Sequence, residues 1–100
     1  MSEEKKKEAG KLEIQIDDEV AQGDYANMAV VDHSDAEFVL DFIFVQPQVP
    51  KGKVRSRVVL APRNAKRLLM VLQDNVARYE EKFGTIEPGT PQPRKEGEYH

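Results

Sequence analysis

The chain has 100 residues, of which 39% are hydrophobic and 33% charged, and its formal net charge is −3. This length suits one domain and leaves no room for a second core. The absence of cysteine excludes disulfides and thiolate metal sites. No apolar N-terminal leader and no apolar run of about 18 residues is present, which predicts a cytoplasmic protein without a membrane partner.

The N-terminal quarter of the chain is mostly polar. Residues 1–10 carry mixed charges and are predicted to form a disordered tail. Residues 11–17 alternate between apolar and polar side chains, as a half-buried strand requires; the apolar positions are Leu12, Ile14 and Ile16. Residues 18–24 form an acidic connector with one possible helical turn near residues 19–22, and Gly23 ends it.

Three further strands are predicted, at residues 25–32, 36–45 and 53–60. The turn at residues 32–35 is rich in Asp and Ser, but its length is open, and with it the face on which Met28 and Val30 lie. The loop at residues 46–52 contains two prolines and a glycine.

A long helix follows the last strand. Pro62 suits its first position because the missing N–H costs nothing there, and Gly84 suits its end. Apolar residues at spacings of three and four form one stripe: Ala65, Leu68, Leu69, Leu72, Val76, Tyr79 and Phe83. Residues 85–100 are predicted to be a flexible tail. The predicted fold is an α+β domain over residues 11–84, a four-stranded antiparallel meander packed on one C-terminal helix.

The polarity of the last two strands predicts their register. Opposite pairs would be Val45–Lys53, Phe44–Val54, Ile43–Arg55, Phe42–Ser56, Asp41–Arg57, Leu40–Val58, Val39–Val59 and Phe38–Leu60. One face then carries Phe38, Leu40, Phe42 and Phe44 and should lie under the helix. The opposite face is a candidate homodimer interface, with Asp41 and Arg57 as a cross-strand ion pair; its members are Val39, Asp41, Ile43, Val45 and Val59. Alternatively, these branched residues are simply good strand formers.

Charge is segregated along the chain. Residues 13–41 hold nine acidic residues and no cation, whereas residues 45–72 hold seven cations and no acid. Three interpretations stay open: an anion-binding surface for nucleic acid, acidic and basic surfaces that meet between subunits, or a solvated surface. The candidate phosphate contacts come from the last strand and the helix start: Lys53, Arg55, Arg57, Arg63, Lys66 and Arg67.

Residues for catalysis are missing from the pattern. The two histidines are His33, in a turn, and His100, at the end. No spacing of His and Glu suits a metal, and no glycine-rich phosphate loop precedes the helix. The sequence therefore predicts a protein without enzymatic activity, cofactor or metal.

Several short segments resemble a small bacterial family known as a domain of unknown function; they lie at residues 19–23, 27, 30–34, 37–42, 49–51, 53–54, 56–57 and 65–68. Family members often carry Thr or Ser where this chain has Ala61, which implies a weaker helix N-cap here. The predicted architecture is also similar to that of dimeric transcription cofactors that bind single-stranded nucleic acid, although fold alone does not fix function.

These observations favour a dimeric, non-enzymatic protein that binds single-stranded DNA or RNA. The alternative is a protein–protein adaptor or self-assembling scaffold that uses the mixed sheet face. Single-strand platforms stack bases on aromatic side chains, whereas the predicted register points Phe38, Phe42 and Phe44 to the core face, away from the cations.

Overall fold

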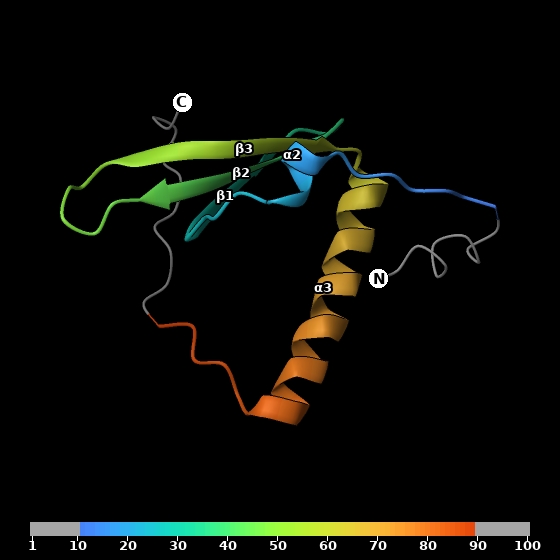
Figure 1. The fold of residues 1–100 in the computed structure, drawn as a ribbon. Coiled ribbons are helices and arrows are strands. Elements are labelled where there is room, and N and C mark those ends of the chain that lie inside the picture. The colour runs from blue at the N-terminus through green and yellow to red at the C-terminus, as the bar shows by residue number, and fades with distance from the viewer. Residues whose placement is uncertain (1–10, 90–100) are drawn as a thin grey trace.

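The chain is described by a computed structural model over residues 11–89. The predicted tail at 1–10, and residues 90–100 of the predicted tail at 85–100, lie outside the described residues. The element order is α2 (Asp18–Ala21), β1 (Met28–His33), β2 (Phe38–Val45), β3 (Gly52–Leu60) and α3 (Pro62–Phe83). The strands form one antiparallel sheet in the order β1-β2-β3 (Figure 1). The α+β class and the C-terminal helix are confirmed, but the sheet has three strands, not four.

The missing strand is the predicted one at residues 11–17. This segment is extended and pairs with no strand of the sheet within the described chain. Its apolar side chains Leu12, Ile14 and Ile16 are 49–62% exposed. An alternating pattern shows which face a strand would bury, but a strand also needs a neighbouring edge for its backbone hydrogen bonds. Figure 1 shows the segment leaving the body of the molecule instead of joining the sheet.

The hairpin between β1 and β2 is closed by a four-residue loop. His33 lies opposite Phe38, so residues 34–37 form the loop. The hydroxyl of Ser34 accepts hydrogen bonds from the backbone N–H groups of Ala36 and Glu37, at 3.1 and 3.3 Å. This loop settles the register that the sequence left open, because it places Met28 opposite Ile43 and Val30 opposite Asp41.

The pairing of β2 with β3 follows the prediction for five of its eight pairs. The pairs from Phe38–Leu60 to Phe42–Ser56 are confirmed, and the register then shifts between Phe42 and Ile43. The observed pairs beyond the shift are Ile43–Val54, Phe44–Lys53 and Val45–Gly52, so the predicted pairs Ile43–Arg55, Phe44–Val54 and Val45–Lys53 are wrong. Arg55 is the extra residue of this β-bulge, which an argument from strict alternation does not include.

Helix α3 begins and ends where the sequence predicts. Pro62 is its first residue, and Ala61 at the N-cap supplies no side-chain hydrogen bond. Gly84 has a φ of 102° and donates its N–H to the carbonyl oxygen of Glu80 at 2.9 Å. This positive φ explains why glycine stands at the helix end.

The helix does not cover the sheet, contrary to the prediction. It starts beside the end of β3 and projects away from the strands (Figure 1). Only its first turns approach the sheet, and the predicted stripe is exposed at Leu69, Leu72, Tyr79 and Phe83 by 50–66%. The one-residue connection after β3, Ala61, fixes where the helix begins but not that the helix folds back over the sheet.

The core of the described chain is consequently very small. Among residues 11–89, Ile43 is the one buried hydrophobic side chain, with 4% exposure, and Asp41 is the one buried charged residue, with 2%. A single apolar side chain out of water contributes only about 1.5–3 kcal/mol. The large apolar surfaces that the fold leaves open therefore need a further explanation.

Candidate nucleic-acid interface

The six cations that were predicted to contact phosphates do not share one surface. Opposite residues in an antiparallel pair lie on the same sheet face, and Lys53 lies opposite Phe44, whereas Arg57 lies opposite Asp41. Since Phe44 and Asp41 are an odd number of residues apart on β2, their side chains point to opposite faces. The bulge at Arg55 thus places Lys53 and Arg57 on different sides of the sheet, and the predicted alternation of Lys53, Arg55 and Arg57 on one face is wrong.

Arg57 is occupied by an ion pair, as predicted. Its Nε and Nη2 donate to the two carboxylate oxygens of Asp41 at 2.6 and 2.8 Å. This fork geometry is the strongest form of a guanidinium–carboxylate contact. Asp41 is 2% exposed, and a buried carboxylate is costly unless it is paired. The guanidinium of Arg57 therefore has a structural role and is committed to Asp41.

The cations near the start of β3 instead surround an aromatic ring. A hollow of about 560 Å³ lies at this end of the sheet, and we call it the Phe44 hollow. It is lined by Phe44, Gln46, Lys51, Gly52, Lys53 and Arg55. No acidic residue lines it, and within residues 11–89 neither Lys51 nor Lys53 takes part in an ion pair. The hollow is therefore a locally positive concave surface.

One acidic residue, Asp24, and one aromatic residue, Tyr25, contact side chains that line the Phe44 hollow. Asp24 lies 3.9 Å from Arg55, with both side chains about half exposed, and such a surface pair is worth about 1 kcal/mol or less. The ring of Tyr25 meets the ring of Phe44 edge to face, at 6.1 Å between centroids and 65° between planes. Tyr25 is 71% exposed. Tyr25 and Phe44 thus form a pair of adjacent rings next to the three cations of the hollow. A base can stack on such a surface while its phosphates meet positive charge.

The expectation that Phe38, Phe42 and Phe44 point away from the cations is thus corrected at Phe44. Phe44 was assigned to the covered apolar face, and the bulge moves Lys53 onto that same face. Lys53 remains exposed because this end of the sheet is open to solvent. Lys51 and Gln46 were not singled out from the sequence. The two prolines and Gly52 mark a loop, but they do not show that its two ends line one hollow with Phe44.

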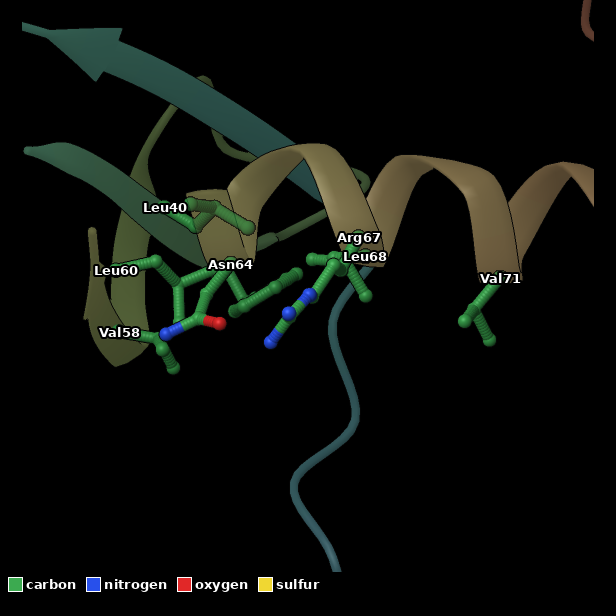
Figure 2. Close-up of a pocket in the computed structure, with 8 residues that line it drawn as sticks. Leu40, Val58, Leu60, Asn64, Arg67, Leu68 and Val71 are labelled. Atoms are coloured by element: carbon green, nitrogen blue, oxygen red, sulfur yellow. The ribbon is translucent and has the colours of Figure 1, made fainter. Parts of the chain in front are cut away.

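The cations at the helix start lie elsewhere. Arg63, Lys66 and Arg67 follow the other end of β3, and seven residues of strand separate Lys53 from Leu60, or about 24 Å at 3.4 Å per residue. All three are exposed. Arg67 borders an apolar groove between the helix and the sheet (Figure 2). Sequence proximity to β3 therefore does not bring these cations to the Phe44 hollow.

The predicted interface residues do share one face of the sheet. Val39, Asp41, Ile43 and Val45 alternate along β2, and Val59 lies opposite Val39. Asp41 and Ile43 are already buried within the single chain, while Val59 is 52% exposed. Two of the five side chains are thus inaccessible to a partner without rearrangement.

Other candidate chemistry is sparse in residues 11–89. No group of three or more His, Asp or Glu side chains that could hold a metal ion occurs there. The imidazole of His33 stacks on Phe38 at 5.3 Å between ring centroids. None of the helices in this part of the chain is long and apolar enough to cross a membrane.

Comparison with protein families supports the resemblance seen in the sequence. Residues 1–88 match the model of a family described as "Protein of unknown function (DUF3467)". The chain belongs to the DUF3467 family. No curated protein and no solved structure gives a significant match. The residues that match the DUF3467 model include the whole Phe44 hollow, the sheet and α3, but the family description carries no activity, so function is argued from the site.

Proposed function

We propose that this DUF3467 protein is a non-enzymatic binding protein whose Phe44 hollow takes single-stranded nucleic acid. The observation that carries the proposal is the β-bulge at Arg55, which brings Lys53 and Arg55 to the aromatic ring of Phe44. Without the bulge, the ring and the cation of Lys53 would lie on opposite faces of the sheet.

The chemistry of the hollow favours a single strand over a duplex. Phosphates attract Lys51, Lys53 and Arg55 in any nucleic acid. A base can lie against the Phe44 ring only if it is unstacked and unpaired. The carboxamide of Gln46 can donate to and accept from a base edge or the sugar. We therefore expect a preference for flexible single-stranded DNA or RNA with little dependence on sequence.

Other predicted contacts have a smaller part in this proposal. Arg57 is held by Asp41, and the helix-start cations Arg63, Lys66 and Arg67 lie at the far end of β3. These four residues are left outside the proposed contact surface. Substitutions at the helix start therefore provide a control in which the net charge changes but the residues that line the Phe44 hollow stay the same.

The test is a fluorescence-anisotropy titration of a short labelled single strand, DNA or RNA, with three proteins. We expect the wild-type protein to bind, and the variant Lys51→Glu/Lys53→Glu to lose at least about tenfold in affinity because two phosphate contacts become repulsive. The variant Arg63→Glu/Lys66→Glu changes the net charge by the same amount and should lose much less. Equal losses in both variants would show a general charge effect and no site at Phe44.

A duplex of the same sequence supplies the second comparison. It offers phosphates but no accessible base for the ring. Tighter binding of the duplex than of the single strand would refute the stacking part of the proposal.

A further inference from the structure

Two apolar surfaces of the chain face solvent, although apolar side chains of this number are normally buried. The first is helix α3, whose stripe includes Leu69, Leu72 and Val76, exposed by 50%, 56% and 39%. The second is an apolar groove of about 410 Å³ on the sheet face beside the helix start (Figure 2). It is lined by Leu40, Phe42, Val58, Leu60, Asn64, Arg67, Leu68 and Val71.

The helix cannot fill the groove of its own chain. Leu68 and Val71 border the groove, whereas Leu69 lies about 100° from Leu68 and about 160° from Val71 around the helix, at 100° per residue. In Figure 2 the side chain of Val71 points into open space beyond the sheet. Since α3 projects away from the strands (Figure 1), most of its length meets no other element of the described chain.

A third unmatched element is the extended segment at residues 11–17. Its alternation of Leu12, Ile14 and Ile16 with polar residues is that of a strand, yet it joins no strand within residues 11–89. The sheet in turn has two outer edges, on β1 and on β3, that no described strand covers. Uncovered edges present backbone groups that can pair with another strand.

Each unmatched surface therefore has its complement on the same chain. The exposed helix stripe matches the apolar groove, and the unpaired segment matches a free sheet edge. Reciprocal exchange of the same element between two copies of a chain closes into a two-fold dimer. The single chain also buries only Ile43 among its hydrophobic residues in 11–89, so a folded protein of this size needs additional apolar contact.

Charge indicates which edge the segment joins. Glu13 and Asp17 share the polar side of the segment. When Leu12, Ile14 and Ile16 continue the apolar sheet face of Leu40 and Phe42, this polar side lies on the face of β3 that carries Arg57, away from Lys53. Strand β1 carries Asp32 and no cation. Opposite charges across neighbouring strands stabilise their pairing, and like charges destabilise it. The edge of β3 is therefore the favourable one.

We infer that the occupant of these surfaces is a second copy of the chain, in a homodimer that exchanges two elements. Helix α3 of each copy lies over the apolar groove of the other, and residues 11–17 of each copy add a fourth strand to the β3 edge of the other. This arrangement gives each sheet the four strands and the covering helix that the pattern of the sequence requires. It differs from the interface predicted on the face of Val39 and Val59.

Cysteine labelling tests the arrangement, because the chain contains no cysteine of its own. Leu72→Cys places a thiol on the helix stripe, and Asp74→Cys places one on the opposite side of the same helix. In the single chain, Leu72 is 56% exposed and the side chain of Asp74 62%, so both thiols would react alike with a maleimide. The exchanged dimer predicts that the thiol at position 72 reacts at least about tenfold more slowly than the thiol at position 74.

The same comparison applies to the extended segment, with Ile14→Cys against Gln15→Cys. Sedimentation equilibrium of the unmodified protein, at the concentration used for labelling, is expected to give twice 11.4 kDa. A mass of 11.4 kDa would overturn the inference and leave the stripe for a different partner. If the mass is that of two chains but the thiols at positions 72 and 74 react at equal rates, the helix exchange is overturned. Equal rates at positions 14 and 15 would overturn the strand exchange.

Discussion

Replacement of Arg57 by alanine is expected to destabilise the fold far more than removal of a surface cation. The change deletes the two hydrogen bonds of 2.6 and 2.8 Å to Asp41. Asp41 would then keep a carboxylate that is 2% exposed in the wild-type protein. Breaking a fully buried ion pair costs about 3–5 kcal/mol because one charge stays buried without compensation.

The side chain of Arg57 is 55% exposed, so water can reach part of the space that it leaves. We therefore expect a loss of about 2–3 kcal/mol in the free energy of unfolding, at or just below the lower end of the range for a fully buried pair. For a domain of this size the loss corresponds to a fall of roughly 10–20 °C in Tm.

Urea unfolding followed by circular dichroism measures this loss. All variants must be compared at one protein concentration, because the stability of an oligomer depends on concentration. Arg78→Ala is the matched control, since Arg78 pairs with Asp74 at 2.7 Å on an exposed helix face, with side chains 70% and 62% exposed. Its loss should not exceed about 0.5 kcal/mol. Similar losses in Arg57→Ala and Arg78→Ala would refute the structural role of the buried pair.

Three further substitutions have expected outcomes. Phe44→Leu keeps an apolar side chain but removes the stacking surface, so affinity for a single strand should fall by about 1–3 kcal/mol, measured by anisotropy; unchanged affinity would remove the ring from the site. Ala61→Ser supplies the missing N-cap oxygen of α3 and should raise the unfolding free energy by about 0.5–2 kcal/mol in urea; no gain would mean that the cap is not limiting. Asn27→Ala removes two hydrogen bonds to the Val45 backbone, of 2.9 and 3.1 Å, and should cost about 1–2 kcal/mol by the same assay; a stability equal to wild type would contradict this role.

Local chemistry made the helix and half of the sheet predictable from the sequence. Pro62 and Gly84 have backbone preferences that fix the ends of α3 whatever surrounds them. From Phe38 to Phe42 the register is equally well determined, because a slip would separate Asp41 from Arg57. These signals act between near neighbours or across one pair of strands.

The β-bulge could not be predicted in the same way. Lys53 and Arg55 end up in solvent in either register, so no burial cost distinguishes the two. The Phe44 hollow depends on this choice, and Lys51 enters it only through the shape of the preceding loop. The site therefore needed three-dimensional information that side-chain polarity does not contain.

The positions of residues 11–17 and α3 were missed for a different reason. Their patterns predict buried faces for Ile14 and Leu72, which are 49% and 56% exposed in the single chain, and a pattern does not say whose surface would cover them. Within one described chain nothing does. Periodicity specifies the kind of contact, and the partner has to be found from the structure.

The salt dependence of binding tests the Phe44 hollow most directly. For a short labelled single strand, anisotropy titrations at several salt concentrations give the slope of log K against log salt. Contacts from the three cations Lys51, Lys53 and Arg55 predict a slope of about −2, at roughly −0.7 for each phosphate neutralised. Replacing Lys51 and Lys53 by glutamine leaves one phosphate contact and should reduce the magnitude of the slope to less than about 1. Absence of binding at low salt, or a slope that these two replacements leave unchanged, would contradict a nucleic-acid site in the Phe44 hollow.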